Sequence, residues 1–533
     1  MTLDKIHKSI LRFIYLMFVV LIAGTDCDAT QQNNTGIWID IKSLGASGDG
    51  TTLETNTLQT AIDSVHKAGG GVVVIPKGTF LIGSIIMKHG VEINLSDHAI
   101  LSGSANPNDY KKISNHLALI LAEYAHDISI TGKGTIDGQG LELALAIDSL
   151  HQTGKVIDPS YNYYRIRPSE SVRPQIINFS HCSDIKIKNV TIKNGAGWVT
   201  EYNQCKNVII DSVTITSTAY WNNDGMDICD CKNVTITNCF VNSADDGICL
   251  KSFSRESFND SIYIANCTIR SSASAIKFGT DSRGGFTNIK IEKIKVYDTY
   301  RSAIAIESVD GGIVENIDVS DIEAYNTGNA IFIKLGHRRG DVGSLKNVII
   351  KNLKVAVPFN RPDLEYDLRG PDLPFLHNPF PSSITGIPGF NVENVTLENI
   401  EITYPGRATK GMAYIPLYRL SQVPENEKEY PEFSMFGELP AWGFYIRHVD
   451  GLTMKNIILR VQENDYRPAF VFDDTKNLTL TGSEVHTKNG EKRIVLNNVV
   501  RGQFSNMNVD GDKDYDIIQM GNCELIRNNK SAK

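Results

Sequence analysis

The chain has 533 residues, a formal net charge of −8 and a sequence pI of about 5.9. Because it carries no basic run, these values argue against nucleic acid as a partner, and an anionic substrate would need a local cluster of cations. The length alone would suggest about three domains, but a solenoid grows by adding coils and breaks that rule. No low-complexity tract and no second domain is evident in the sequence.

The first residues have the pattern of a secretory signal peptide. A basic start precedes the apolar run Phe13–Ala23, and small residues lead to a plausible cleavage point near Ala29. At about 11 residues, the apolar run is too short to span a bilayer. We therefore expect residues 1–29 to be a signal peptide, residues 30–533 to form one catalytic domain, and the protein to be exported to the periplasm or the extracellular space. Lipidation at Cys27 stays open.

The mature chain opens with a glycine-rich segment, a helical pattern and a strand. These are Gly45–Gly50, Thr57–Ala68 and Val72–Ile75. An amphipathic helix before the first coil would cover the apolar end of a solenoid, which otherwise exposes its core to water. We therefore predict that Thr57–Ala68 is an N-terminal helical cap.

A repeated signature then runs along the chain, in which an Asp or Asn begins an alternating apolar and polar run. The marker residues are Asp184, Asn207, Asn233, Asn259, Asn288, Asn316 and Asn347, at spacings of 23 to 31 residues. Self-similarity of this period indicates a solenoid, and the alternation indicates strands. With three short strands in each coil, the chain is predicted to be an all-β, right-handed parallel β-helix. Asn suits the turns because it tolerates a left-handed backbone, so we expect a stack of Asn side chains.

Other residues of the repeat bear on the core and on the surface. The cysteines that recur at matching points are Cys182, Cys205, Cys231, Cys239, Cys249 and Cys267. They are predicted to fill the core, although disulfides are an equal alternative in an exported protein. No His or Cys cluster completes a zinc site, so we predict no metal and no cofactor. Long insertions at 140–174, 356–390 and 405–445 interrupt the repeat, and such insertions usually build a binding face.

Four carboxylates lie within 23 residues on two consecutive turns of the repeat: Asp224, Asp227, Asp245 and Asp246. Like charges this close repel one another, so one of them should hold its proton to a higher pH than an isolated Asp. A protonated carboxylic acid beside ionised carboxylates is suited to acid/base cleavage of a glycosidic bond.

These motifs resemble glycoside hydrolase family 28, the polygalacturonases and their relatives, over nearly the whole mature chain. The shared features are Gly48-Asp49-Gly50, Val72–Gly78, Arg173-Pro174, the coil of Trp198, Asn222–Asp227 and Asp245-Asp246. The segment Tyr430–Pro440 is similar to divergent bacterial, exo-acting members of that family.

The resemblance implies single-displacement hydrolysis with inversion of configuration. By position, Asp245 matches the general acid, and Asp224 and Asp246 match the pair that activates water. Inverting chemistry usually needs acid and base carboxyls roughly 6.5–9.5 Å apart. Because neighbouring coils lie about 4.8 Å apart, outward and slightly offset residues could meet that distance. Asn222 and Asp227 are candidates for substrate binding, although Asp227 has an equal alternative role in bonding a turn.

Two positions depart from the family pattern. The usual Gly-His-Gly falls at Ala273–Ala275, where Ser274 replaces the His, and the usual Arg-Ile-Lys falls at Ala305–Glu307. In polygalacturonases that Arg and Lys hold a uronate carboxylate, which an Ala cannot bind and Glu307 would repel.

Other side chains are candidates to replace the missing cations. The basic candidates for substrate binding are Lys251, Lys277, Arg283, Lys334 and Arg338. Outward residues on consecutive coils would place Lys251, Lys277, Glu307 and Lys334 in one stripe, and Arg suits a bidentate contact with a carboxylate. Taken singly, each could equally be a solvated surface residue. Trp221, beside Asn222, is the aromatic residue expected to line the cleft.

We therefore expect an exported, monomeric glycoside hydrolase without stable membrane insertion. Its expected substrate is a pectin-type, galacturonate-containing polysaccharide or oligosaccharide of the plant cell wall, cleaved from a chain end. One alternative keeps the fold and mechanism on a plant glycan without galacturonate. A polysaccharide lyase would need a catalytic Arg or Lys and usually calcium, and a non-catalytic β-helix binding protein would not need the carboxylates. The sugar, the linkage, the exo or endo mode and the oligomeric state stay open.

Overall fold

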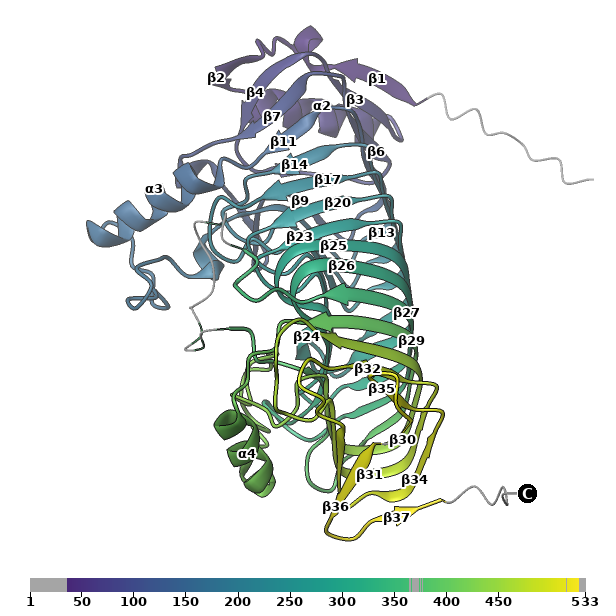
Figure 1. The fold of residues 1–533 in the computed structure, drawn as a ribbon. Helices are drawn as coiled ribbons and strands as arrows, with labels where there is room; N and C mark the ends of the chain where they lie inside the picture. Colours follow the sequence, from purple (N-terminus) through teal and green to yellow (C-terminus); the bar gives the residue numbers. More distant parts are fainter. Residues whose placement is uncertain are drawn as a thin grey trace, which may run out of the picture.

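The computed structural model describes residues 36–526, apart from 364–365, 367–372, 374, 376 and 514. The predicted signal peptide lies outside the described residues. Within them the chain winds into a right-handed parallel β-helix, in which each strand pairs in parallel with its equivalent in the next coil (Figure 1). The predicted fold is confirmed. None of the described helices is long and apolar enough to cross a membrane.

Three sheets run along the solenoid. The first sheet contains β5 (Ile85–Ile86), β9 (His116–Glu123), β12 (Gln175–Ser180), β15 (Thr200–Asn203), β18 (Met226–Cys229), β21 (Ile248–Ser252), β24 (Ile276–Ser282), β28 (Ser382–Thr385), β33 (Arg493–Asn497) and β36 (Asp516–Met520). The second sheet contains β1 (Ile37–Asp40), β3 (Gly71–Ile75), β6 (Val91–Leu95), β10 (His126–Gly132), β13 (Ser183–Lys188), β16 (Lys206–Asp211), β19 (Lys232–Thr237), β22 (Asn259–Ala265), β34 (Val500–Ser505) and β37 (Glu524–Leu525). The third sheet contains β2 (Asp49–Leu53), β4 (Gly78–Ile82), β7 (Ala99–Gly103), β11 (Thr135–Asp137), β14 (Thr191–Lys193), β17 (Thr214–Ser217), β20 (Phe240–Ser243), β23 (Thr268–Ser271), β32 (Glu484–His486) and β35 (Asn508–Val509).

In the C-terminal half, single long strands bend round the corners and take part in more than one sheet. They are β25 (Gly285–Ser308), β26 (Ile313–Leu335), β27 (Ser344–Ala356), β29 (Val392–Tyr404), β30 (Phe444–Val461) and β31 (Phe470–Thr481). The antiparallel exception is β8 (Lys112–Ile113), which pairs with β9.

The N-terminal end of the core is covered by helix α2 (Thr55–Lys67), which confirms the predicted cap within two residues. Leu58, Ile62 and Val65 are fully buried on its apolar face. Isolated from the solenoid, these side chains would be exposed to water, so the helix and the first coils stabilise each other by burial of apolar surface. Short 3₁₀ helices lie at Ile41–Leu44, Pro107–Asp109, Glu170–Val172 and Leu420–Gln422.

Five of the six repeated cysteines fill the core as predicted. Cys182, Cys205, Cys231, Cys239 and Cys267 belong to the continuous core of inward-facing Ile, Val and Leu side chains. All eight cysteines in the described part of the chain are free thiols, so the disulfide alternative is wrong. The sixth, Cys249, lies outside the core on the outer face of β21, which corrects its predicted position.

The predicted Asn stack lies at the turns of the second sheet. Asn288, Asn316 and Asn347 all have a left-handed backbone, with φ between +54° and +59°. The Nδ2 of Asn316 donates to the Oδ1 of Asn288 at 3.1 Å, and the Nδ2 of Asn347 donates to the Oδ1 of Asn316 at 3.3 Å. Each Asn therefore links two neighbouring coils while occupying a conformation that most residues avoid.

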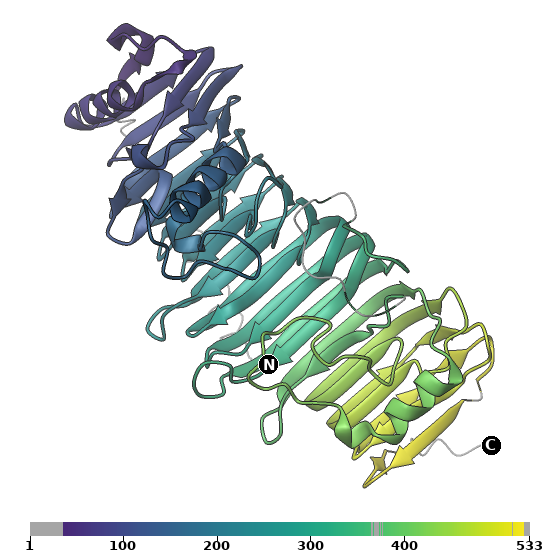
Figure 2. The same ribbon diagram turned by 90° about the vertical axis from the view of Figure 1, so that its left-hand side faces the viewer.

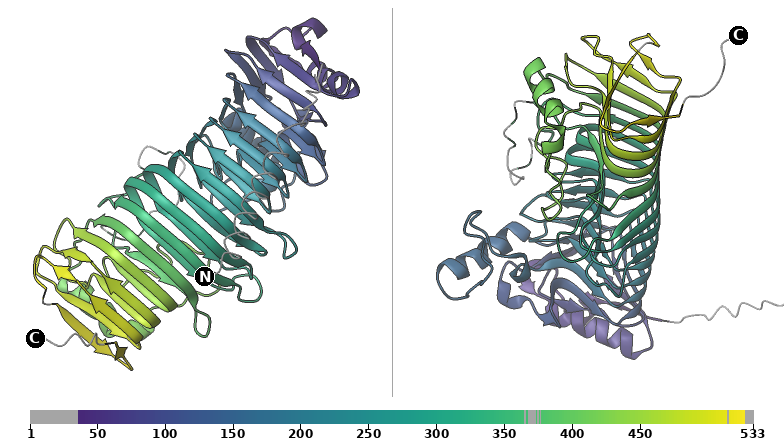
Figure 3. Two further views of the ribbon diagram at one scale, coloured as in Figure 1. Left: turned by 90° about the vertical axis from the view of Figure 1, so that its right-hand side faces the viewer. Right: turned by 90° about the horizontal axis from the view of Figure 1, so that it is seen from below.

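Two of the predicted insertions place helices on the same side of the solenoid, over the first sheet. Helix α3 (Gly140–Gln152) and helix α4 (Lys410–Tyr418) project from this side in two perpendicular views (Figures 2 and 3). The insertion 356–390 is described only in part.

Replacing Asn316 should separate the two contributions of the stack. Asn316→Ala loses both amide hydrogen bonds and keeps a Cβ at φ +59° without the local bonding by which Asn tolerates this conformation, whereas Asn316→Gly loses the same bonds and also removes the Cβ. Because a left-handed conformation costs about 1–2 kcal/mol for an ordinary residue, we expect the Ala variant to have the lower free energy of unfolding. Urea unfolding followed by circular dichroism measures the difference. Equal values for both variants would contradict a conformational role, and wild-type stability in both would exclude any role of the stack.

Candidate active site

Buried hydrogen bonds fix the turn that carries Asp224. The fully buried Asn223 donates from Nδ2 to two backbone carbonyl oxygens of the preceding coil, each at 2.9 Å. Asn222 has a φ of +56°, and its Oδ1 accepts a hydrogen bond from Nη2 of the buried Arg173 at 2.8 Å. Breaking such a network would leave buried polar groups unsatisfied, so it holds the backbone before Asp224 in one conformation.

Asp245 and Asp246 occupy the equivalent turn of the next coil. The carbonyl oxygen of Asp245 accepts hydrogen bonds from the hydroxyls of Ser243 and Ser271, at 2.8 and 2.6 Å. The Oδ1 of Asp246 accepts from the backbone N–H of Ser274 at 3.0 Å. The turn is therefore tied both to its own coil and to the following one, which fixes where the two carboxylates point.

The three carboxylates predicted to be catalytic converge on one point. Asp224, Asp245 and Asp246 each place one carboxylate oxygen within 4.8 Å of the others. These nearest oxygen atoms are closer together than the roughly 6.5–9.5 Å predicted between the acid and base carboxyl groups, because two of the groups are sequence neighbours and the third is only one coil away. Oxygens at this separation can both accept hydrogen bonds from a single water, since each such bond spans about 2.7 Å.

Two buried lysines neutralise part of this negative charge. The Nζ of Lys251 lies 3.0 Å from Asp224 and 2.7 Å from Asp227, and the Nζ of Lys277 lies 3.1 Å from Asp246. Lys251 and Lys277 are 6% and 1% exposed. The carboxylates outweigh the effect of burial and raise the pKa of both ammonium groups, so both stay charged.

The charges in the cluster do not balance. The acids are Asp224, Asp227, Asp245, Asp246 and Glu307. Lys251, Lys277 and Arg301 act on them, and Arg338 acts on Glu307 from its pair with Asp310. Because Arg301 and Arg338 also pair with Glu432 and Asp310, the acids outnumber the cations in this buried site. Because buried unpaired charge is expensive, the cluster favours protonation of some of its acids near neutral pH.

The pKa shifts show which acids gain protons. Burial raises the pKa of Asp224 and, helped by the charge of Asp246, that of Asp245. Burial also raises the pKa of Asp227 and that of Glu307 to about 7. Asp246 differs: burial acts to raise its pKa, but the attraction of Lys277 and Lys251 outweighs this and lowers it. Asp245 and Asp246 are thus adjacent carboxyls with opposite shifts, the pattern of an acid beside a base.

Two groups of side chains have the composition of a cation site. They are Asp224, Asp227 and Cys249, and Asp224, Asp245 and Asp246. The ammonium of Lys251, which also lies 2.9 Å from the Sγ of Cys249, already supplies a positive charge to the first group. The second is the convergent set of carboxylates described above.

Residues 68–357 match the family glycosyl hydrolases family 28. The chain belongs to that family. It is 26% identical over 329 residues to a probable polygalacturonase of Vitis vinifera, an alignment that covers 58% of this chain and 59% of the relative. It is 34% identical over 119 residues to an exo-poly-α-D-galacturonosidase of Dickeya chrysanthemi, with 19% of each chain covered. The chain therefore spans about three fifths of the length of the first relative and about one fifth of the length of the second.

A solved structure shares the fold. The exopolygalacturonase of Thermotoga maritima superimposes with a TM-score of 0.59 at 20% sequence identity, over 80% of this chain and 92% of that one. At this identity the likeness establishes the β-helical fold alone, and the chemistry has to be argued from the side chains of this chain.

The family's Gly-His-Gly position carries a different arrangement here. Ser274 contributes its backbone N–H to Asp246, and the ammonium of Lys277, three residues on, reaches the same carboxylate. Glu307 lies 1% exposed in the cluster, with its Oε2 buried and without a hydrogen-bond partner among the described residues. The raised pKa of Glu307 favours its neutral, protonated form. In that form Glu307 would not repel an anion, in contrast to the repulsion predicted from the sequence.

The predicted stripe of side chains divides into two columns. Asp227, Cys249, Lys277 and Ala305 pair in register along one outward row, whereas Glu307 and Lys334 pair along another. The predicted single stripe is therefore wrong. Every second residue of a strand points outward, so successive outward residues of one strand belong to different rows, and the prediction merged these rows. Substrate binding by Lys251 and Lys277 stays a prediction, with their ammonium groups already engaged by carboxylates.

Three other predicted cations bind other partners. Arg338 makes a bidentate pair with Asp310, through Nε at 3.0 Å and Nη2 at 2.6 Å. Lys334 donates to the carbonyl oxygen of Glu425 at 2.9 Å, and the exposed Arg283 reaches a backbone carbonyl at 3.4 Å. The structure does not bring these three side chains to the convergent carboxylates.

Sequence reasoning missed Arg301 and Tyr430. Arg301 lies one coil beyond Ala273, whose carbonyl oxygen accepts its backbone N–H at 2.8 Å, and its charge acts on both Asp245 and Asp246. The ring of Tyr430 lies under the cationic groups of Lys277 and Arg301, and its hydroxyl accepts from Lys277 at 3.0 Å. Counting one coil onward from Ala273 would have found Arg301, but no repeat signal indicates Tyr430, which lies in an insertion.

The insertion at 405–445 closes one end of the site. Phe433, Phe436 and Leu439 pack in a buried apolar cluster on outward residues of the first sheet, including Ala305 and Phe332. Ala305 and Phe332 lie on the second and third coils after that of Asp245 and Asp246, beyond β24 with Lys277. We call Phe433, Phe436 and Leu439, together with Tyr430, the C-terminal wall. On the other side, a hollow of about 200 Å³ is lined in part by Asn178, Trp198 and Glu201.

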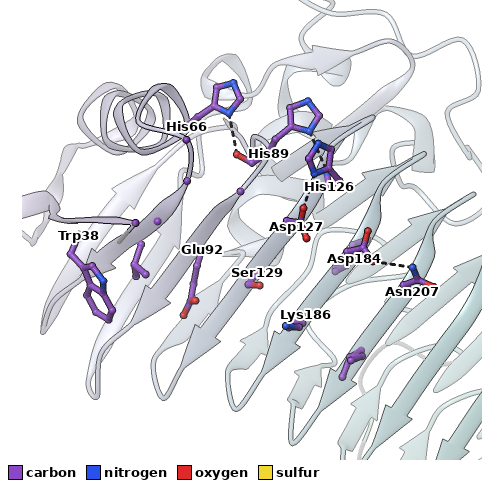
Figure 4. Close-up of a pocket in the computed structure, with 18 residues that line it drawn as sticks. Trp38, His66, His89, Glu92, His126, Asp127, Ser129, Asp184, Lys186 and Asn207 are labelled. Carbon is purple, nitrogen blue, oxygen red and sulfur yellow. Dashed lines mark hydrogen bonds and ion pairs between the residues drawn. The ribbon is translucent and has the colours of Figure 1, made fainter. Parts of the chain in front are cut away.

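A larger hollow of about 820 Å³ lies beside the cap and contains none of the carboxylates of the site. It is lined by Trp38, by His66 at the end of helix α2, by His89 and His126 on two successive coils, and by polar residues of the second sheet (Figure 4). The candidate active site is therefore the carboxylate cluster on the first sheet.

Removing the charge of Lys251 should destabilise the fold. Lys251→Met leaves Asp224 and Asp227 without their cation, and breaking a buried ion pair from one side costs about 3–5 kcal/mol. The double variant Lys251→Met/Asp227→Asn should recover part of that loss, because one buried charge is removed. Urea unfolding measures both. Lys455→Met, which removes a half-exposed partner of Glu398, is the matched control and should cost about 1 kcal/mol or less. A loss in Lys251→Met no larger than in the control would contradict the compensating role.

Proposed function

We propose that the protein is an exported, exo-acting glycoside hydrolase that removes uronate residues from the ends of pectin-type chains by inverting acid/base hydrolysis. The observation that carries this proposal is the convergence of Asp224, Asp245 and Asp246, with opposite pKa shifts on the last two. Membership in glycosyl hydrolases family 28 supports the reaction class.

Asp245 is the proposed general acid. Among the described residues it is the one of the three carboxylates without a lysine ion pair, and its raised pKa favours the protonated form that can donate to a glycosidic oxygen. Protonation of that oxygen allows the C–O bond to break with the leaving sugar departing as a neutral hydroxyl, while positive charge develops on the anomeric carbon.

Asp224 and Asp246 are proposed to hold the attacking water. Each is ion-paired to a buried lysine, which favours a fixed carboxylate orientation, and their oxygens are close enough to accept both protons of one water. Asp246, whose pKa is lowered, is the base that accepts the proton as the water oxygen attacks. The lysines also reduce the nucleophilicity of both carboxylates, which favours attack by water over a covalent intermediate.

The C-terminal wall supports the exo mode. Its apolar cluster occupies the outer face of the first sheet from the second coil after Asp245 and Asp246 onward, so a polymer could not continue along the sheet in that direction. The relative from Dickeya chrysanthemi also bears the name of an exo-acting enzyme. A terminal uronate is proposed to meet Arg301 at this wall, since a guanidinium suits a carboxylate.

A second substrate class is favoured by one observation. Ala305 and Glu307 replace the cations that hold a uronate in polygalacturonases, which favours a plant glycan without galacturonate cleaved by the same machinery. Export is proposed from the sequence alone, on the basic start and short apolar run of residues 1–29.

Product analysis with an acid-site variant tests the function. Purified protein should release monomeric galacturonate from oligogalacturonides and little or nothing from neutral oligosaccharides, and Asp245→Asn should lower kcat by about 10³-fold with binding retained. Asp184→Asn is the matched control, because Asp184 accepts from Asn207 in the outer ladder, where Asn occupies equivalent positions.

The products also decide between the alternatives. Activity on neutral glycans alone would contradict the uronate assignment, and unsaturated products would indicate a lyase. Internal fragments as the first products would exclude exo action. Proton NMR of the first-formed anomer should show inversion, and a retained configuration would contradict the role of water as the direct nucleophile. Full activity of Asp245→Asn would overturn the acid assignment.

The pH dependence should follow the opposite shifts of the two carboxyls. Activity needs Asp246 ionised and Asp245 protonated, so kcat/KM should fall below the lowered pKa of Asp246 and above the raised pKa of Asp245. Lys277→Met removes a charge that lowers both pKa values and contacts Asp246 directly. We therefore expect the acid limb to move upward by about 1–2 pH units, with a smaller upward shift of the alkaline limb. An unmoved acid limb would show that Lys277 does not set the charge of Asp246.

A further inference from the structure

A hairpin in the first insertion reaches the carboxylates from the side opposite the C-terminal wall. Asn162 and Arg167 form an antiparallel bridge with N–O distances of 3.0 and 3.2 Å, and Asn162 Oδ1 accepts the backbone N–H of Arg165 at 2.9 Å. The buried Asp158 closes the base of the hairpin by accepting from the backbone N–H groups of Ser160 and Ser169, at 3.0 and 2.6 Å. These bonds give the hairpin a defined shape.

The hairpin places two guanidinium groups against Trp221. The Cζ atoms of Arg165 and Arg167 lie 5.2 and 4.8 Å from the centre of the Trp221 ring. Trp221 itself is fixed, because its carbonyl oxygen accepts from the buried Arg173 at 2.7 Å and its ring packs beside the apolar cluster of helix α3. Two like charges held against one aromatic ring repel each other, and an anion between or beside them would relieve that repulsion.

These arginines differ from the other cations near the site. Lys251, Lys277 and Arg338 each have a carboxylate within 4 Å, whereas neither Arg165 nor Arg167 has an ion-pair partner among the described residues. The Nη1 of Arg167 is buried and has no hydrogen-bond partner in the described part of the chain. The charge of Arg167 acts on Asp245, with Glu170 the other acid nearby. A buried, unsatisfied guanidinium nitrogen on a hairpin that packs against Trp221, three residues before Asp224, has the character of an unfilled anion site.

We propose that Arg165, Arg167 and Trp221 form a second uronate subsite, which binds the carboxylate of the sugar on the far side of the scissile bond. This rests on the proposed function, which places the terminal sugar at the C-terminal wall and Asp245 at the bond between the two sugars. The subsite accounts for the loss of cations at Ala305 and Glu307: the binding charge has moved from a strand of the first sheet to the hairpin. The enzyme then selects two consecutive uronates and discriminates against a terminal uronate linked to a neutral or esterified neighbour.

Two disaccharides test the subsite: digalacturonate, and digalacturonate methyl-esterified on its second, leaving sugar. The wild type should prefer the free acid by about 10–100-fold in kcat/KM, the range of a charge-assisted hydrogen-bonded pair. Arg165→Gln/Arg167→Gln should reduce this ratio to about one, and Arg165→Lys/Arg167→Lys should retain part of it. Because each ratio is taken within one variant, it is independent of differences in folded fraction. Arg460→Gln, a half-exposed arginine paired with Glu401, is the control and should keep the wild-type ratio.

A binding measurement separates failure of the subsite from failure of the proposed function. Calorimetric titration of Asp245→Asn with trigalacturonate should detect binding that weakens with salt, and addition of the two Gln substitutions should weaken it by 10-fold or more. An ester preference, or an affinity, unchanged by the Gln substitutions would overturn the subsite even in an active hydrolase. Absence of uronide hydrolysis by the wild type would overturn the proposed function, while an affinity dependent on Arg165 and Arg167 would still support the subsite.

Discussion

The parallel register between coils is the constraint on which the rest of the molecule depends. Each strand pairs with its equivalent in the next coil, so residues one repeat apart in sequence become direct neighbours in space. This brings Asp224 beside Asp246 and Lys251 beside Asp227, and it stacks the Asn side chains at the turns. A change of one residue in coil length on the first sheet would move an outward side chain into the core and dismantle the cluster.

The buried cluster shows how the solenoid tolerates so many acids in one place. Lysines on the following coils supply two positive charges within 3.1 Å of carboxylates, which is sufficient to hold Asp246 ionised but not to neutralise all five acids. Burial, with a smaller contribution from neighbouring carboxylates, raises the pKa of Asp245, Asp227 and Glu307. Unequal compensation by a regular scaffold is therefore sufficient to distinguish neighbouring carboxyls of the same chemical type.

The repeat made most of the fold predictable from sequence. Alternating Ile and Val, Asn at the turns and the cap helix each follow from local rules, and the structure confirms them. The grouping of Asp224, Asp245 and Asp246 was also predictable, because it depends only on coil spacing. The ion-pair partners of the lysines were not predictable. A lysine near acids in the sequence can point to solvent or to a carboxylate, and the burial of the side chain, which the sequence does not show, decides which of the two it does. Tyr430 and Arg167 could not be placed, because insertions follow no repeat and their positions depend on tertiary packing.

The C-terminal wall has a consequence for how the rate would depend on the polymer. A cleft blocked beyond its reacting groups can engage a chain only at its terminus, so for the proposed reaction the effective substrate concentration is the number of termini per volume. For a fixed mass of polysaccharide that number rises as the chains become shorter. Long, intact chains would therefore be consumed slowly and would keep their viscosity, and prior fragmentation by an internally cutting enzyme would accelerate turnover in proportion to the new ends created.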